Sequence, residues 1–190
     1  MRENHVTRGV SSQNETCKVM EDLRKFIRDV PNFPKPGIVF KDITPLLHNP
    51  KAFARVIQIF VDRYSNEKID RIIGIESRGF IFGAALSVQM EIGFVPIRKH
   101  GKLPWTKVSE EYVLEYGKDR IEMHVDAVSA GDKVLVVDDL LATGGTCAAV
   151  CQLVEKQRAQ VASLAFVVEL DFLKGREKLK DRDIFSIMHF

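Results

Sequence analysis

The stretch Val134-Leu-Val-Val-Asp-Asp-Leu-Leu-Ala-Thr-Gly-Gly-Thr146 carries the features that decide the fold of this 190-residue chain. An apolar run, typical of a buried strand, ends at two adjacent carboxylates, Asp138 and Asp139. A small glycine-rich turn with hydroxyl side chains follows, and a helical pattern begins after it. Glycines let backbone N–H groups approach an anion, and a helix N-terminus adds further donors. The stretch therefore predicts a strand–turn–helix unit whose turn holds a phosphate.

The two carboxylates predict a second function for the same unit. They would repel a phosphate, so we expect them to contact the hydroxyls or the metal of the same ligand. The stretch is not a P-loop, because no lysine follows the glycines, and G-x-G-x-x-G does not occur in the chain. A ligand with a phosphate, a polyol and a divalent cation fits these features. An ordinary turn between a strand and a helix is the alternative interpretation.

The composition is that of a globular chain, because 45% of the residues are apolar and 28% are charged. The formal net charge of +2 indicates attraction to neither nucleic acid nor a membrane. No apolar run approaches the length of a membrane span, and residues 1–16 lack the hydrophobic segment of a secretory signal. We expect a disordered tail over residues 1–15 and a single domain over residues 16–190.

The three cysteines, Cys17, Cys147 and Cys151, favour a reducing compartment, because an odd count without a signal does not indicate a disulfide framework. We therefore expect a cytoplasmic protein. Cys147 and Cys151 fall in helical register with Val150 and Val154, which predicts a buried stripe rather than a metal or redox pair.

Strand and helix patterns alternate along most of the chain, which predicts an α/β fold with a mainly parallel sheet. Residues 98–115 lack periodicity and predict a long loop or lid, and residues 37–44 predict an extended or loop segment. The expected strands are 71–75, 94–97, 120–125, 133–137 and 161–168, and the expected helices are 23–30, 53–64, 81–90, 147–157 and 173–179, with a final apolar stretch at 184–188. Loops 76–80 and 138–146 both follow strands, so they should meet at the carboxyl edge of the sheet.

Residues 138–146 resemble the phosphoribosyl-pyrophosphate motif of the type I phosphoribosyltransferases. The resemblance to the adenine-specific members of that family extends over roughly residues 20–180, through motifs in the same order. These motifs are Phe33–Pro45, Gly74–Gly83, Pro96–Pro104, Leu114–Gly117 and Lys174–Leu179.

The resemblance implies the family's fold, with a small N-terminal hood at about residues 16–50 and a flexible lid at about residues 98–116. It also implies a purine-salvage enzyme, which transfers the 5-phosphoribosyl group of phosphoribosyl pyrophosphate to adenine and yields AMP and pyrophosphate. The implied cofactor is Mg²⁺, held mainly by substrate and water with no direct protein ligand. A homodimer is implied, with no nucleic-acid or membrane partner.

The resemblance assigns two groups of residues to phosphoribosyl pyrophosphate. The ribose hydroxyls and the 5-phosphate are expected on Asp138, Asp139, Ala142, Thr143, Gly144, Gly145 and Thr146. The pyrophosphate is expected on Glu76, Ser77, Arg78, Lys99 and Lys102, with Arg98 beside them. Cations suit a leaving group that gains negative charge. A non-proline cis peptide is also implied within residues 76–78.

Catalysis is expected from Glu115, Tyr116 and Arg78, with Glu115 handling a proton of the purine ring. Adenine is expected on Val39, Phe40 and Lys41, where an aromatic ring can stack on the base and backbone groups can contact its edge. Without the resemblance, Phe40 reads as a core residue and Glu115 as a surface residue.

Two alternatives remain at this point. One is a phosphoribosyltransferase for a 6-oxopurine, against which residues 39–41 resemble the adenine type. The other is a non-catalytic regulator that senses phosphoribosyl pyrophosphate and binds DNA. Against the regulator, the sequence shows no added helix-turn-helix and no strongly basic segment. An inactive paralogue is disfavoured, because every matched site residue is chemically competent.

Overall fold

The computed structural model describes residues 22–114 and 117–190, and the chain divides at Val56 into two compact units. In the first unit, β1 (Arg28–Pro31) pairs antiparallel with β2 (Val39–Asp42). Two cross-strand ion pairs join them, Arg28–Asp42 at 2.6 Å and Lys41–Asp29 at 2.7 Å. The predicted helix over residues 23–30 is wrong beyond Arg24, because residues 25–26 form a turn and residues 28–30 belong to β1. The extended segment predicted at 37–44 is confirmed over β2.

Two α-helices, α2 and α3, follow β2. The helix α2 spans Thr44–His48, and α3 spans Pro50–Tyr64, which confirms the helix predicted at 53–64. At the start of α2, Thr44 donates hydrogen bonds from its backbone N–H and its hydroxyl to the carboxylate of Asp42, the last residue of β2. Those bonds, with the nearby Arg28, lower the pKa of Asp42 to about 2.

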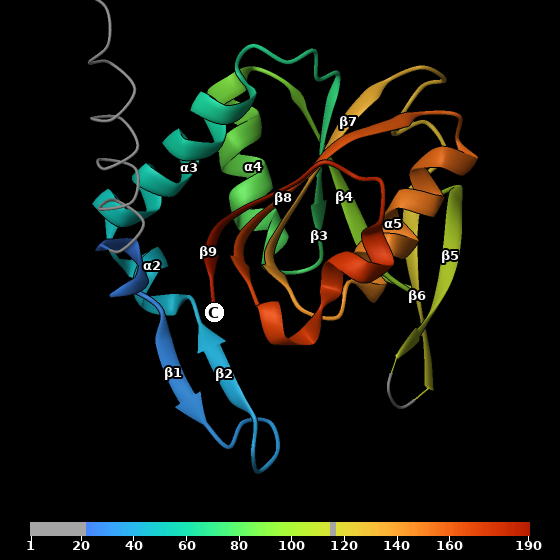
Figure 1. Ribbon diagram of the computed structural model, residues 1–190. Coiled ribbons are helices and arrows are strands. Elements are labelled where there is room, and N and C mark those ends of the chain that lie inside the picture. Colours follow the sequence, from blue (N-terminus) through green and yellow to red (C-terminus); the bar gives the residue numbers. More distant parts are fainter. Residues whose placement is uncertain (1–21, 115–116) are drawn as a thin grey trace, which may run out of the picture. The chain divides into compact units, whose positions relative to one another are not determined.

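A seven-stranded sheet forms the second unit, among the residues that the structure describes. Its spatial order is β5-β6-β4-β3-β7-β8-β9 (Figure 1). The strands β3, β4, β7, β8 and β9 run parallel to their neighbours in this group, whereas β6 runs antiparallel to β4 and β5. The bounds are β3 Arg71–Ile75, β4 Gly93–Lys99, β5 Lys107–Leu114, β6 Gly117–His124, β7 Lys133–Leu141, β8 Gln160–Glu169 and β9 Ile184–His189.

Two helices connect the parallel strands on opposite faces of the sheet. The helix α4 (Gly79–Met90) connects β3 to β4, toward the β5 edge of the sheet. The helix α5 (Gly145–Lys156) connects β7 to β8, toward the β9 edge. Because both crossovers are right-handed, α4 and α5 lie on opposite sides, as Figure 1 shows. The strand order reverses between β3 and β7, and such a point is where open α/β sheets bind ligands.

The core stripe predicted on α5 is confirmed. Cys147 and Cys151 are 4% and 2% exposed, and they pack with Val150 and Val154 against the central strands. Both cysteines are free thiols. Burial of this apolar face fixes α5 on the sheet, and thereby fixes the turn that precedes it.

Residues 98–115 are not the long loop that the sequence predicts. Lys107–Leu114 is the strand β5, which forms a hairpin with β6. The alternation in β5 is real, because Tyr112 is buried while Lys107 and Glu111 are exposed. Glu110 occupies an inward position beside Lys156 of α5 and interrupts the apolar pattern. The connection from β4 to β5 is therefore short.

The C-terminal region also differs in detail from its prediction. The predicted helix at 173–179 consists of two 3₁₀ turns, η1 (Asp171–Leu173) and η2 (Gly175–Leu179). The final apolar stretch at 184–188 forms the strand β9. No helix among residues 22–114 and 117–190 is long and apolar enough to cross a membrane. The tail over residues 1–15 lies outside the described residues, and the single domain over 16–190 with its hood and lid stays a prediction.

Candidate active site

Two loops meet where the strand order reverses. Residues 76–78 leave β3 and lead into α4, and residues 142–144 leave β7 and lead into α5. A pocket of about 230 Å³ lies between these loops and the β5–β6 hairpin. It is lined by Ile75, Glu76, Ile97, Lys99, Tyr112, Asp119, Ile121, Asp138 and Thr146. The two loops that the sequence predicts to converge therefore do converge, around a cavity.

A second hollow, of about 90 Å³, lies directly on the glycine-rich turn. Its lining includes Asp138 and all five residues predicted to hold the 5-phosphate, Ala142, Thr143, Gly144, Gly145 and Thr146. Gly144 has a φ of 76° and stands immediately before the first turn of α5. In this position the amides of the turn and the N-terminus of α5 are available to an anion. Asp138 and Thr146 line both hollows, so the two lie next to each other.

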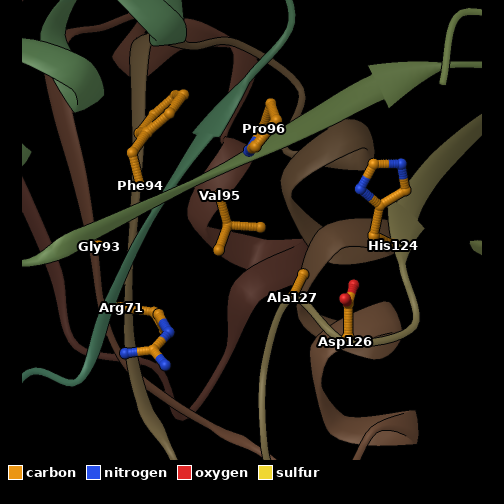
Figure 2. A pocket seen from close by; sticks show the side chains of 8 residues that line it. All are labelled: Arg71, Gly93, Phe94, Val95, Pro96, His124, Asp126 and Ala127. Atoms are coloured by element: carbon orange, nitrogen blue, oxygen red, sulfur yellow. The ribbon is translucent and has the colours of Figure 1, made fainter. Parts of the chain in front are cut away.

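Another hollow, of about 200 Å³, lies away from the predicted site residues. Arg71 and Gly93, the first residues of β3 and β4, line it together with Phe94, Val95, Pro96, His124, Asp126 and Ala127 (Figure 2). It is thus at the amino ends of these strands, opposite to the edge where the two loops meet.

The acidic pair is held by an ion pair across the reversal point. Arg78 Nε lies 2.8 Å from Asp139 Oδ2, and the Asp139 side chain is only 5% exposed. Burial raises the pKa of Asp139, and the nearby Arg78 guanidinium opposes that rise. The arginine predicted for the pyrophosphate and the aspartate predicted for the ribose therefore contact each other.

Asp138 differs from its neighbour because its carboxylate faces the pocket. Its Oδ1 accepts a hydrogen bond of 2.9 Å from the backbone N–H of Asp139. Burial, and then the negative charge of Asp139, raise the pKa of Asp138 well above the usual range of a carboxyl group. A ligand that brings hydroxyl donors or a positive charge to this carboxylate would stabilise its ionised form.

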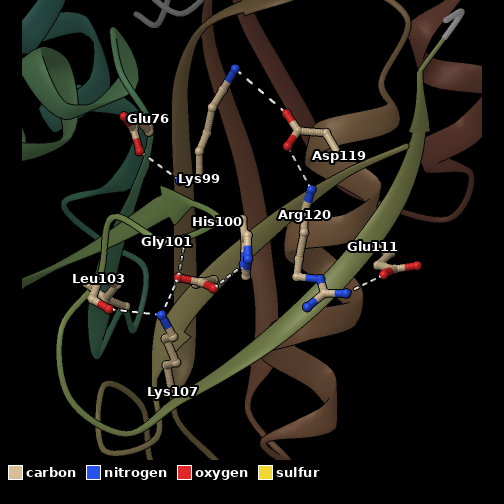
Figure 3. A network of polar contacts seen from close by, with 10 residues as sticks. Glu76, Lys99, His100, Gly101, Leu103, Lys107, Glu111, Asp119 and Arg120 are labelled. Atoms are coloured by element: carbon tan, nitrogen blue, oxygen red, sulfur yellow. Dashed lines mark hydrogen bonds and ion pairs between the residues drawn. The ribbon is translucent and has the colours of Figure 1, made fainter. Parts of the chain in front are cut away.

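Glu76 contacts three basic residues of the site, and Figure 3 shows its contact with Lys99. Its carboxylate accepts a 2.8 Å bond from Lys102 Nζ, a 3.1 Å bond from Arg98 Nε and a 2.7 Å bond from the backbone N–H of Lys99. Burial alone would raise the pKa of Glu76, but these bonds outweigh it and lower the pKa to about 2. Of the residues predicted for the pyrophosphate, Glu76, Lys99 and Lys102 thus form one cluster with Arg98. In this cluster the glutamate pairs with the charges of Arg98 and Lys102 and holds the backbone of Lys99.

The hairpin supplies two pocket residues that the sequence did not indicate, Tyr112 and Asp119. The Tyr112 hydroxyl donates a 3.0 Å bond to Asp119 Oδ2, and Lys99 Nζ lies 3.7 Å from the same oxygen (Figure 3 shows the Lys99–Asp119 pair). Burial raises the pKa of Tyr112. The inward alternation of Val108, Glu110 and Tyr112 was the signal that could have placed Tyr112 in the site.

The remaining predicted residues are distributed as follows. A cis peptide bond joins Glu76 to Ser77, which confirms that expectation. Glu115 and Tyr116 lie outside the described residues. Val39, Phe40 and Lys41 form most of β2 in the first unit, where the Phe40 ring meets the Phe33 ring edge-to-face at 5.3 Å.

The comparisons with known proteins agree with this arrangement. Residues 42–189 match a family model described as a phosphoribosyl transferase domain. An adenine phosphoribosyltransferase of Chloroflexus aurantiacus is 56% identical over 170 residues, which cover 90% of this chain and 98% of that one.

Solved structures give the same result. The adenine phosphoribosyltransferase of Thermoanaerobacter pseudethanolicus is 50% identical, with a TM-score of 0.87 over 90% of this chain and 99% of that one. The enzyme of Saccharomyces cerevisiae, solved with an imino-altritol bisphosphate and adenine, is 42% identical, with a TM-score of 0.85 over 90% and 99% of the two chains. The chain therefore belongs to the type I phosphoribosyltransferase family, and within that family to the adenine phosphoribosyltransferases.

Proposed function

We propose that this chain transfers the 5-phosphoribosyl group of phosphoribosyl pyrophosphate to adenine, yielding AMP and pyrophosphate for purine salvage. The observation that carries the proposal is the pair of adjacent pockets, lined by Asp138, the phosphate turn and residues of the Glu76 cluster. These pockets have room and charge for each part of one substrate: a phosphate, a diol and a pyrophosphate.

The turn at residues 142–146 is proposed to hold the 5-phosphate through its amides and the hydroxyls of Thr143 and Thr146. Asp138 and Asp139 are proposed to accept the ribose hydroxyls. As the bond between the sugar carbon and the pyrophosphate breaks, positive charge develops on the ribose. Two fixed carboxylates then stabilise the transition state more than the ground state.

The leaving pyrophosphate is assigned to Ser77, Arg78, Lys99 and Lys102. Arg78 and Lys102 have carboxylate partners in the described structure, so each would exchange part of that contact for a phosphate oxygen. Glu76 is proposed to act on these cations rather than on the anion, because a carboxylate repels a pyrophosphate. Such pre-positioned cations need little reorganisation when the leaving group gains charge.

The residues proposed to bind adenine and to move its proton are supported by the family resemblance alone. Adenine is proposed to stack on Phe40 and to meet backbone groups of Val39 and Lys41. Glu115 is proposed to accept the proton that leaves the purine ring as the new carbon–nitrogen bond forms, and Tyr116 to lie over the reacting ribose.

The donor set of the pocket agrees with a Mg²⁺ ion that the substrate carries. Asp139 is paired with Arg78, which leaves Asp138 as the member of the acidic pair that faces the pocket. Within the described residues, the three-ligand group that lies together is Glu169, Asp171 and His189, which does not line this pocket. Mg²⁺ commonly keeps several waters and binds proteins through one or two carboxylates plus phosphates. Here it would neutralise the pyrophosphate.

We also propose an oligomeric state and a cellular compartment for the chain. A homodimer is proposed, and sedimentation of the purified chain at two concentrations tests it against a monomer. The cytoplasm is proposed as its compartment, since Cys147 and Cys151 are free buried thiols, which agree with reducing conditions.

The decisive experiment mixes the purified chain with phosphoribosyl pyrophosphate and Mg²⁺ and offers adenine, hypoxanthine, guanine and xanthine separately. AMP from adenine alone is the expected result, and chelation of the metal should stop it reversibly. Nucleotide from an oxopurine only would replace the adenine assignment with the 6-oxopurine alternative. Binding of phosphoribosyl pyrophosphate without any product would favour the regulator.

A further inference from the structure

The backbone of Gly175 passes directly against the phosphate turn. A Cβ atom on Gly175 would lie 2.3 Å from the carbonyl oxygen of Ala142, and a Cβ atom on Gly144 would lie 2.5 Å from the carbonyl oxygen of Gly175. Real Cβ atoms do not approach other atoms so closely, so the two backbones touch without room for a side chain. The conformation of the turn therefore depends on where η2 begins.

The position of Gly175 depends in turn on its neighbour Arg176. Arg176 forms a two-pronged ion pair with Glu169, with 2.7 Å from Nε to Oε1 and 2.8 Å from Nη2 to Oε2. Ser186 Oγ donates a third bond of 2.6 Å to Oε2 of the same carboxylate. A forked pair of this kind fixes both distance and orientation.

Glu169 is suited to anchor this pair because it is rigid and buried. Its side chain is 4% exposed, and it is the last residue of β8, where it pairs with Leu141 of β7 and His189 of β9. Leu141 immediately precedes the phosphate turn. The anchor is thus tied to the turn both through the sheet and through Arg176 and Gly175.

We propose that Glu169 and Arg176 are positioning residues for the 5-phosphate: their ion pair holds Gly175 against the turn, and so keeps the turn in its phosphate-binding shape. This inference rests on the proposed function for the identity of the anion. Neither residue lines the pocket, so both act through the backbone of η2. The Glu169, Asp171 and His189 group is not a metal site in this interpretation, because Arg176 occupies both oxygens of Glu169.

The experiment compares Arg176→Gln with Arg182→Gln as a matched control. Arg182 is a nearby arginine in an ion pair with Glu155, close to the far end of α5 from the turn. For Arg176→Gln, we expect KM for phosphoribosyl pyrophosphate to rise by roughly tenfold to a hundredfold, because small displacements of binding groups are costly. KM for adenine should change by less than about twofold, and Arg182→Gln should leave both constants unchanged.

Two further measurements separate positioning from folding. The double variant Glu169→Gln with Arg176→Gln removes both charges, so it leaves no unpaired buried carboxylate if the single variant fails to fold. Arg176→Lys should recover only part of the affinity, because an ammonium lacks the two-pronged geometry. Calorimetric binding of ribose 5-phosphate gives a readout that needs no turnover, and hydrogen exchange at residues 142–146 should accelerate in Arg176→Gln.

The outcomes distinguish this inference from the proposed function. If the folded double variant binds ribose 5-phosphate as the wild type does, with unchanged exchange at the turn, the positioning role is overturned. A weaker binding confined to the Glu169 and Arg176 variants supports it. If the wild-type chain binds ribose 5-phosphate but forms no AMP, the proposed function fails while the positioning result stands independently.

Discussion

Arg78 and Asp139 form an ion pair of 2.8 Å between the exits of two different strands, β3 and β7. The pair joins a residue proposed for the leaving group to a residue proposed for the sugar. Because Arg78 has a carboxylate partner before any substrate is bound, a pyrophosphate must compete with Asp139 for the guanidinium. The two half-sites are therefore electrostatically coupled rather than independent.

Asp139→Asn should remove the electrostatic coupling between the residue proposed for the pyrophosphate and the residue proposed for the ribose. The variant loses the charge that we propose to stabilise a cationic ribose and removes the carboxylate that pairs with Arg78, while its amide has nearly the same size. We expect kcat for AMP formation to fall by about 10²–10³, the range for removal of one electrostatic contact to a transition state. Thermal unfolding should show an intact fold, and wild-type turnover in the folded variant would refute the role.

Asp138→Asn should stabilise the ligand-free protein while it inactivates the enzyme. The folded-state pKa of Asp138 lies well above its unfolded value, so this carboxyl group lowers stability as the pH rises through the folded pKa. An amide avoids that buried charge. We expect Tm to rise by roughly 2–4 °C at pH 8, with the difference from wild type shrinking toward acid pH. Melting curves between pH 5 and pH 8 test this, and a constant difference across the range would contradict it.

Glu76→Gln should show the opposite pH dependence. The pKa of Glu76 is lowered to about 2, so its ion pairs stabilise the folded state above the unfolded pKa and are lost as the pH falls toward 2. The variant should melt earlier than wild type at pH 7, and the two curves should approach each other between about pH 4.5 and pH 2. Lys102 and Arg98 are partly exposed, so salt should reduce the difference.

The same variant has a kinetic consequence. Without its carboxylate, the cluster of Arg98, Lys99 and Lys102 loses its common anchor, and these cations no longer stand pre-positioned for the leaving group. We expect kcat to fall more than affinity for adenine changes. Glu111→Gln is the control, since it removes an exposed hairpin carboxylate, paired with Arg120, that does not line the pocket.

Glu115→Ala should cut turnover by about 10²–10⁴, the usual range for loss of a general acid or base. Binding of phosphoribosyl pyrophosphate should be nearly unchanged, because the role assigned to Glu115 concerns the base. A pH–rate profile adds a sharper criterion, since the variant should lose the ionisation that belongs to Glu115. A folded variant with wild-type turnover would remove Glu115 from the mechanism.

The sequence predicts the centre of this fold well, for a physical reason. Residues 133–146 encode burial, turn and helix start within one local stretch, so no distant partner is needed to interpret them. The stretch at 71–80 has the same property. Because β3 and β7 run parallel, both loops leave the same edge of the sheet, and the convergence predicted there is what the structure has.

The errors occur where distant partners decide the local structure. Val30 continues a helical apolar pattern, but cross-strand pairing of residues 28–31 with β2, including the Arg28–Asp42 ion pair, makes this segment a strand. In β5, Glu110 faces inward because Lys156 on α5 neutralises it, which hides the alternation from a single sequence. The Arg78–Asp139 contact was invisible for the same reason, because each residue was assigned to a different part of the substrate.

The burial of Cys147 makes its thiol a probe of local opening at the start of α5. This thiol lines the hollow of the phosphate turn, yet it is 4% exposed, and its hydrogen bond with Cys151 and its burial raise its pKa well above the usual thiol range. A protonated, enclosed sulfur reacts with an alkylating reagent only when local opening separates the start of α5 from the sheet. The alkylation rate of Cys147 therefore reports how often this opening occurs. Substrate bound at the turn should make the opening rarer and so slow the alkylation.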